Sequence, residues 1–377
     1  MTAMEKVHDI VENRHQYAID WKKKTGGKVV GCFCSYVPEE LIWAAGALPV
    51  RILGSHETQD VADSHIAGIF CPHCRDTLAQ GLQGRYDYLD GIVNAHTCIH
   101  MNQAFNSWGE HVTKGYNYFF IIPSNFQIPY ALSELTHEMG EFKRSLEEWT
   151  GKSISQEDLD KAIEVFNTNR GLLREIYDLR KSDPPLLSGL EAMELTLVNM
   201  IMDREECNAL LADALKEIKE RPSTIPSNIR LMIVGSENDD REYVRYIETL
   251  GATIVIDDQC TGSRHFWNDV TPGGDPLMAL AERYRNRPRC PLKDGGKRTR
   301  FEHMLKLAKE WDAAGVIIGQ QKFCDPMGYE IPAMQTMFKK NDIPSMVLEL
   351  DVTVAHGLVR TRVQAFLEML DLEAALF

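Results

Sequence analysis

The stretch from Phe70 to His100 decides the fold, and it reads FCPHCRDTLAQGLQGRYDYLDGIVNAHTCIH. Cys71 is followed at once by Pro72, which suits the first turn of a helix because proline has no N–H to leave unpaired there. Apolar residues continue at helical spacing as far as Gly84, which is a natural helix end. This part of the stretch therefore predicts a helix that begins at a cysteine. Because the dipole of such a helix favours a thiolate, we expect a lowered pKa for Cys71.

The second part of the stretch predicts a buried strand followed by a loop that ends at Cys98. Residues 88–93 are few, mostly apolar and compatible with β-structure. Upstream, residues 29–31 and 49–53 predict two further strands, with a helix between them that begins at Pro38. Strands that alternate with helices indicate a parallel sheet, so the expected fold class is α/β.

The last third of the chain repeats the pattern of the first third. Residues 230–235 match residues 28–31 as a strand that ends in glycine, and a helix and a second strand follow in both places. We therefore expect two related Rossmann-like or flavodoxin-like parallel-sheet domains, with a helical segment between them and an N-terminal helix. The expected bounds are an N-terminal helix at 1–27, a first α/β domain at 28–150, a helical segment at 151–226 and a second α/β domain at 227–377.

Two pairs of cysteines occupy equivalent places in this repeat. Cys290, like Cys71, precedes a proline, and Cys324, like Cys98, follows a predicted buried strand. The ligand site of an open parallel sheet lies beyond the carboxyl ends of its strands. If the two halves face each other, Cys98 and Cys324 therefore point into one cleft.

Composition excludes several classes of function. The chain has 377 residues, enough for two domains, and a net charge of −14, which argues against nucleic-acid and membrane-surface partners. No apolar run reaches transmembrane length, and the polar N-terminus lacks the apolar core of a signal peptide. Nine cysteines in such a chain point to thiols or metal ligands, not to a disulfide framework. We expect a cytoplasmic protein.

Three hypotheses account for the cysteines. Cys71-Pro-His-Cys74 before a helix is typical of a thiol–disulfide oxidoreductase, but that function leaves Cys98 and Cys324 unused. A zinc site would use Cys71, Cys74, Cys98 and His100, although the single CxxC and the irregular spacing differ from those of a finger or ribbon. An iron–sulfur cluster would use Cys71, Cys98 and Cys324 and would leave one iron open to another ligand. The spacing by itself leaves all three open.

Several motifs occur in order along nearly the whole chain: VPEELIWAAG at 37–46, FCP at 70–72, YLDGIV at 88–93 before Cys98, and KFCDP at 322–326. In this order they resemble the benzoyl-CoA reductase / 2-hydroxyacyl-CoA dehydratase family of iron–sulfur subunits. Within that family, VRILGSHE at 50–57 is most similar to the smaller catalytic subunit of the reductase branch.

The resemblance implies a cofactor, partners and a substrate. It implies that Cys71, Cys98 and Cys324 ligate a low-potential 4Fe–4S cluster, and that a related second iron–sulfur subunit completes the enzyme. It also implies an acyl-CoA substrate and electrons from an ATP-hydrolysing activator protein. The function expected is an ATP-dependent benzoyl-CoA reductase, with a 2-hydroxyacyl-CoA dehydratase or a double-cubane cluster reductase of small molecules as alternatives. Cys74 and Cys290 depart from a three-cysteine pattern and leave a larger, double-cubane cluster open.

Further candidate residues lie in the loops at the strand ends. Ser35, Tyr36 and His96 are candidate catalytic residues, because a thioester oxygen that gains charge needs hydrogen-bond or proton donors. The candidate substrate-binding residues are His100, Lys293, Lys297 and Arg298. The three cationic residues would meet CoA phosphates, or simply form a solvated basic loop. Cys207 is expected to be a core residue and Cys260 to be inert, whereas Cys32 and Cys34 are expected near the cleft and receive no role.

The two Gly-Gly-Lys segments do not form a nucleotide site. Neither residues 26–28 nor residues 295–297 have the GxxxxGK[ST] spacing that a P-loop needs to cradle phosphates. We therefore expect this chain to bind no ATP itself.

Overall fold

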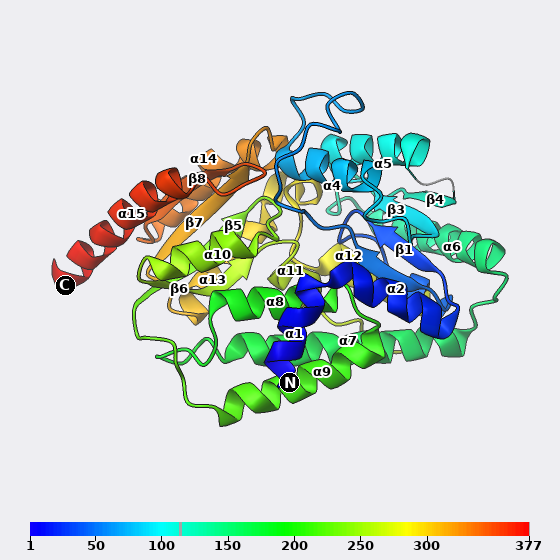
Figure 1. Ribbon diagram of the computed structural model, residues 1–377, viewed down its shortest axis with the longest axis horizontal. Coiled ribbons are helices and arrows are strands. Elements are labelled where there is room, and N and C mark those ends of the chain that lie inside the picture. The colour runs from blue at the N-terminus through cyan, green and yellow to red at the C-terminus, as the bar shows by residue number, and fades with distance from the viewer. Residues whose placement is uncertain (113–114, 377) are drawn as a thin grey trace.

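The computed structural model describes residues 1–112 and 115–376 and contains two four-stranded sheets (Figure 1). The first has the order β2-β1-β3-β4 and the second β6-β5-β7-β8, and every pairing is parallel. The first-sheet strands are β1 (Val29–Cys32), β2 (Leu48–Arg51), β3 (Gly91–Ala95) and β4 (Tyr116–Phe120). The second-sheet strands are β5 (Ile229–Gly235), β6 (Ala252–Asp258), β7 (Gly315–Gln321) and β8 (Ser345–Leu350). The two sheets share one strand order, so the predicted α/β fold of two related parallel-sheet units is confirmed.

Helices connect the strands within each half. Those of the first half are α3 (Glu39–Ala44), α4 (Pro72–Leu82) and α5 (Ile99–His111). Those of the second half are α10 (Arg241–Thr249), α11 (Ser263–Phe266), α12 (Pro276–Asn286), α13 (Thr299–Glu310), α14 (Asp325–Lys340) and α15 (His356–Leu376), with 3₁₀ turns η1 (Pro291–Lys293) and η2 (Gly295–Lys297). As predicted, α4 begins directly after Cys71 with Pro72 in its first turn.

A helical segment follows the first half in the chain and lies beneath the sheets in the view of Figure 1; it consists of α7 (Gln156–Asp178), α8 (Gly189–Asn199) and α9 (Arg204–Glu220). The helix before it, α6 (Ala131–Thr150), packs on the first half beside β4. Capping boxes start α7 and α8, at Ser155 with Asp158 and at Ser188 with Glu191. The segment is fastened to the first half by buried ion pairs, because Arg170 contacts Glu40 and Arg204 contacts Glu39 at the start of α3.

The N-terminus differs from the single helix predicted over residues 1–27. It forms two helices, α1 (Ala3–Glu12) and α2 (Arg14–Thr25). The break falls at Asn13, whose φ of −106° and ψ of 32° are not helical. The Asn13 side chain hydrogen bonds to the backbone oxygen and carboxylate of Asp9, the local pairing by which asparagine competes with a helix. The break turns α1 onto α8 and α9 of the helical segment.

The apolar core packs the two sheets against the helices. One cluster joins the second sheet to α7, α8 and α9, and two others cover the opposite faces of the first sheet. Each buried aliphatic or aromatic side chain contributes roughly 1.5–3 kcal/mol relative to exposure. Among the helices of the described residues, none is both long and apolar enough to cross a membrane.

Candidate functional site

A cavity of about 120 Å³ lies between the two halves, at the carboxyl ends of their strands. Loops that follow β1, β2 and β3 line it from one side, and loops that follow β5, β6 and β7 line it from the other. This is the place at which open parallel sheets bind their ligands. The predicted cleft between two facing halves is therefore present, and Cys98 and Cys324 both line it.

Six of the nine cysteines line this one cavity, three from each half. They are Cys34, Cys71, Cys98, Cys260, Cys290 and Cys324. Local structure explains four of these positions, because each of the four thiols is the residue directly before a helix or 3₁₀ turn: α4, α5, η1 and α14. The cysteines at equivalent places in the sequence repeat thus line the same cavity from opposite halves.

Burial keeps the thiols of Cys98, Cys260 and Cys324 protonated in the absence of a ligand. It raises the pKa of Cys260 and of Cys324 to about 11, and it raises the pKa of Cys98 well above that of a free thiol. Neighbouring thiols add to the effect, since Cys71, Cys290 and Cys324 all act on Cys98. A metal group that binds here must therefore displace protons, which a cluster of highly charged irons does.

The expectation of a lowered pKa at Cys71 is wrong. Its pKa is raised, first by the hydrogen bond with Cys74 and then by burial, and these effects outweigh the helix dipole. The Cys74 thiol also donates to the backbone oxygen of His100 at 2.8 Å and does not line the cavity. Reactive thiols of disulfide oxidoreductases have lowered pKa values, so the raised pKa of Cys71 disfavours the thiol–disulfide oxidoreductase hypothesis.

The spacing of the thiols distinguishes a single ion from a cluster. Within residues 1–112 and 115–376, one group of three potential ligands lies within 4.8 Å of one another, and it contains no cysteine: His73, Glu237 and Asp239. The cavity cysteines therefore surround a space instead of converging on one ion, as the tetrahedral ligands of zinc would. Thiolates that bind different irons of a cluster are spaced in this way, so the donor set fits an iron–sulfur group.

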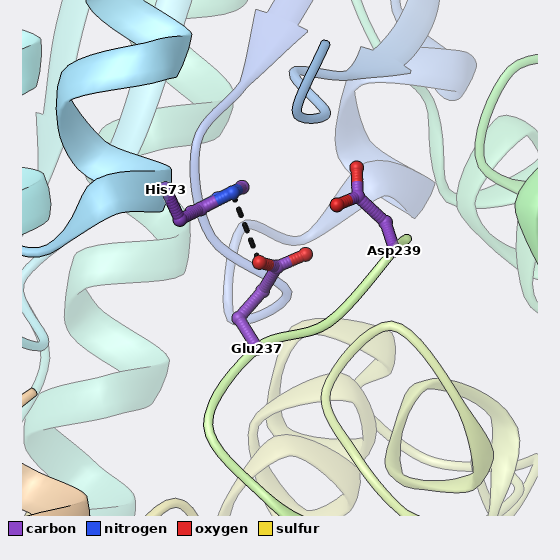
Figure 2. A group of neighbouring side chains, drawn as sticks. All are labelled: His73, Glu237 and Asp239. Atoms are coloured by element: carbon purple, nitrogen blue, oxygen red, sulfur yellow. Dashed lines mark ion pairs between the residues drawn. The ribbon is translucent and has the colours of Figure 1, made fainter. Parts of the chain in front are cut away.

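Figure 2 shows the neighbouring His73, Glu237 and Asp239, which lie where the two halves meet. His73 stands on α4 of the first half, and its Nδ1 lies 2.9 Å from a carboxylate oxygen of Glu237 in the loop after β5. Burial alone would lower the pKa of His73, but the Glu237 carboxylate raises it, which favours an ion pair. Beside this pair, Asp239 accepts hydrogen bonds from the Gly54 N–H and from His56 Nε2 at 2.8 Å. These contacts join the halves at the rim of the cavity.

The His56–Asp239 contact predicts a pH dependence of stability. Burial alone would lower the pKa of His56, but Asp239 and Asp240 raise it from 6.5 to about 10. Because the folded pKa exceeds the unfolded one, this stabilisation is complete below about pH 6.5 and is lost as the pH rises through about 10. We expect the free energy of unfolding to fall by up to about 1.4 kcal/mol per pH unit across this window, and His56→Gln to remove that part of the slope.

Urea unfolding at several pH values between 6 and 10 measures this slope. His137→Gln is the matched control, because His137 lies on α6 with 76% of its side chain exposed. A His56→Gln protein whose slope equals that of the wild type would show that His56 does not link the halves.

Comparison with known proteins identifies the family. The model of the family described as 2-hydroxyglutaryl-CoA dehydratase, D-component, matches residues 34–370. The chain belongs to this family. It is 29% identical over 369 residues to the (R)-phenyllactyl-CoA dehydratase beta subunit of Clostridium sporogenes, covering 96% of this chain and 97% of that protein.

Two further relatives are named as subunits of a reductase and of a dehydratase. The chain is 28% identical over 334 residues to a subunit of the benzoyl-CoA reductase of Thauera aromatica, covering 87% of this chain and 86% of that protein. It is 27% identical over 355 residues to the (R)-2-hydroxyglutaryl-CoA dehydratase beta subunit of Acidaminococcus fermentans, covering 92% and 94%. These relatives are named as subunits of lyases and of an oxidoreductase, so the predicted family and enzyme class are confirmed at that level.

This member of the dehydratase D-component family brings two of the predicted catalytic residues to the cavity. Ser35 lines it and accepts a hydrogen bond from Arg287 Nη2 at 2.9 Å. Tyr36 also lines it, and its hydroxyl accepts the backbone N–H of Cys290 at 3.2 Å. Burial raises the pKa of Tyr36 to about 12, so its hydroxyl stays protonated and can donate. His96 does not line the cavity, and its ring packs against Phe119.

The predicted substrate-binding residues do not line the cavity. His100 is a brace instead: its Nδ1 accepts the Cys71 N–H at 3.1 Å, and its Nε2 lies 3.5 Å from a carboxylate oxygen of Asp325, beside Cys324. Lys293 is buried, and its Nζ donates to the backbone oxygen of Pro123 at 3.0 Å. Burial lowers the pKa of Lys293 to about 8.

The basic loop after η1 keeps two cations near solvent. Lys297 is exposed, and Arg298 is partly exposed, with its guanidinium over the rings of Phe301 and Tyr329. Contact with CoA phosphates stays a prediction for both.

Cys34 lines the cavity, as its expected place near the cleft indicated, whereas the sequence analysis did not place Cys260 there and missed three arginines altogether. Cys34 follows β1, and Cys260 follows β6, so the rule for strand ends would have indicated both. The arginines are Arg51, Arg264 and Arg287, and all three line the cavity. Cys207 is a core residue on α9, as predicted.

Proposed function

We propose that this chain is the iron–sulfur subunit of an enzyme that delivers single low-potential electrons to its substrate. The observation that carries the proposal is the convergence of six thiols, three from each half, on one buried cavity. Thiolates are the ligands of iron–sulfur clusters, and a cluster supplies one-electron chemistry whose potential depends on hydrogen bonds and solvent exclusion. Cys71, Cys98 and Cys324 are the three ligands common to the sequence-based proposal and the cavity.

The residues around the cavity suit such chemistry. Phe33, Met101 and Met327 give it an apolar wall that excludes water, which strengthens every electrostatic interaction inside it. Ser35 and Tyr36 hold hydroxyl groups at the wall. As negative charge develops on a substrate oxygen, the Tyr36 hydroxyl can donate a hydrogen bond to it without a change of fold.

The proposed substrate is an aromatic acyl-CoA, reduced as by a benzoyl-CoA reductase. Dehydration of a 2-hydroxyacyl-CoA is the alternative, and relatives of both kinds match the chain along most of its length. Both reactions need an electron at a potential that an ordinary donor does not supply, so an ATP-hydrolysing activator would provide the energy.

The ATP consumed per product decides between the two reactions. As a reductase, the complete enzyme should hydrolyse ATP in fixed proportion to the electrons transferred to benzoyl-CoA. As a dehydratase, it should need ATP only to inject a first electron and should then turn over many times. Measuring both quantities in one assay is sufficient, and a catalytic quantity of ATP would overturn the reductase assignment.

A second candidate is a reductase of small molecules at a double-cubane cluster. The observation in its favour is that three thiols beyond Cys71, Cys98 and Cys324 line the same cavity. A single 4Fe–4S cluster leaves these three thiols without an iron to bind, whereas a double-cubane cluster would use three thiolates on each of its two cubanes. We propose that the cavity holds this larger group, whichever substrate it serves. Retention of iron by variants of Cys34, Cys260 and Cys290 would count against it.

Partner subunits are proposed to dock where the cysteine loops reach the surface. Large apolar side chains lie beside four cavity cysteines in the sequence and are exposed: Ile69 by 71%, Ile99 by 66%, Leu292 by 37% and Phe323 by 53%. Phe323 has a φ of 61°, which is strained for a bulky residue, and strain of this kind gathers at functional sites. Exposed apolar residues around a redox cavity suit a protein that approaches closely enough to pass an electron.

We propose a cytoplasmic location, because a reducing cytoplasm would suit the free thiols.

A further inference from the structure

Three buried guanidinium groups line the thiol cavity, on the side formed by Cys34, Cys260 and Cys290. Arg51 ends β2, Arg264 lies on α11, and Arg287 follows α12. Arg264 comes four residues after Cys260, and Arg287 three before Cys290. The three arginine residues are exposed by only 5%, 3% and 2%. They therefore bring three positive charges to one wall of a small apolar space.

These cations lack close carboxylate partners in the part of the chain that the structure describes. Arg51 and Arg287 form no ion pair there, and the nearest approach of Arg264 is 3.6 Å, from its Nε to a carboxylate oxygen of Asp258. Asp258 in turn is held at 2.7 Å by Arg300. By contrast, Arg170 and Arg204 elsewhere in the interior each face a glutamate.

The hydrogen-bonding capacity of the three cations is likewise incomplete. Nε and Nη1 of Arg51, Nε of Arg264 and Nε of Arg287 are buried and have no hydrogen-bond partner among the described residues. An uncompensated buried charge costs several kcal/mol, and an unpaired buried donor adds to this cost. A cavity built in this way fits an anionic occupant that accepts hydrogen bonds.

The two sets of thiols differ in their electrostatic surroundings. On the side of Cys34, Arg287 donates through its Nη2 to the Ser35 hydroxyl at 2.9 Å. Glu237 also lines the cavity, but its carboxylate is paired with His73 at 2.9 Å. The side of the cavity formed by Cys34, Cys260 and Cys290 therefore carries a net positive charge.

We propose that Arg51, Arg264 and Arg287 neutralise the negative charge of the cluster at its Cys34–Cys260–Cys290 end and raise its reduction potential there. The inference rests on the proposed iron–sulfur function and gives three residues of this chain a role in it. The added electron comes from the low-potential partner protein, and no bond to the arginines forms or breaks. Because each guanidinium stabilises the reduced, more negative cluster more than the oxidised one, the electron settles at the cationic end.

Redox titration of the anaerobically purified protein, followed by electron paramagnetic resonance, tests this proposal. Arg51→Met and Arg264→Met each remove a charge and keep most of the packing volume. At a fixed potential, each should lower the ratio of reduced to oxidised cluster by about tenfold, which is a shift of about 59 mV to more negative values. Arg51→Lys should restore much of the shift because it keeps the charge.

Controls separate this proposal from the function on which it rests. Arg180→Met is matched, because Arg180 is 1% exposed but does not line the cavity. It should leave the potential unchanged. Absence of iron from the wild-type protein would contradict the proposed function. Iron-loaded Arg51→Met and Arg264→Met proteins with the reduction potential of the wild type would contradict only the role of the arginines. If Arg51→Met loses its iron, retention of iron by Arg51→Lys supports the charge role, and loss in both variants contradicts it.

Discussion

Replacement of Cys71, Cys98 or Cys324 by alanine, one at a time, is expected to leave the anaerobically purified chain without its cluster. Each of these thiols lines the cavity directly before a helix. A lost metal–thiolate bond removes a ligand outright, whereas a lost core thiol costs only packing. Iron, acid-labile sulfide and the visible absorption of the protein measure the effect. Full iron in any one of the three variants would remove that residue from the ligand set.

The same experiment on the other thiols separates a small cluster from a large one. Alanine variants of Cys34, Cys260 and Cys290 are each expected to lose about half of the iron or more, because these residues are the proposed ligands of the second cubane. Cys207→Ala and Cys74→Ala are the controls, since Cys207 lies in the core and Cys74 donates to His100 outside the cavity. Both controls should keep their iron. An iron content equal to that of the wild type in all three variants would indicate a single 4Fe–4S cluster.

The isolated chain is expected to bind no ATP and to show no turnover, a loss of at least about a thousand-fold relative to the complete system. The structure gives the reason for the first part. Gly26 ends α2 in a left-handed conformation, and residues 295–297 form a single 3₁₀ turn, so neither Gly-Gly-Lys segment forms a phosphate-binding loop before a helix. Under the proposed function, the energy for the electron is therefore expected to enter through another protein.

Two measurements check this dependence on a partner. Equilibrium dialysis with ATP tests binding by the chain alone, and an assay with dithionite and acyl-CoA tests turnover before and after the activator is added. Docking that relies on the net charge of −14 should weaken with salt if the partner face is basic. Tight ATP binding by this polypeptide alone would contradict the proposal that a separate activator binds and hydrolyses the ATP.

The fold followed closely from the sequence because its signals are local and repeated. A strand that ends in glycine, a helix and a second strand occur twice, and strand order follows from the shared connections of the two halves. The break at Asn13 was not visible, since the apolar pattern continues through it and the side-chain bonds to Asp9 that mark it are seen only in the structure. Boundaries set by one side chain escape a periodicity argument.

The candidate site was predicted in part for a related reason. Cys71, Cys98 and Cys324 lie in motifs that carry the resemblance, and the convergence of Cys98 and Cys324 followed from the rule for parallel strand ends. The cavity arginines come from separate segments, and no spacing links Arg51 to Arg264. Lys293 suggested a phosphate contact by charge alone, but its burial against Pro123 depends on how η1 packs on the first half. Tertiary contacts of this kind carry no sequence period.

We propose that six thiols of this chain hold an iron–sulfur group. The decisive measurement is the content of iron and acid-labile sulfide per chain, in protein purified without oxygen and without added metal chelators. We expect a brown protein with about eight irons per chain and a similar amount of sulfide, as two cubanes require. Zinc in place of iron, with no visible charge-transfer absorption, would contradict it.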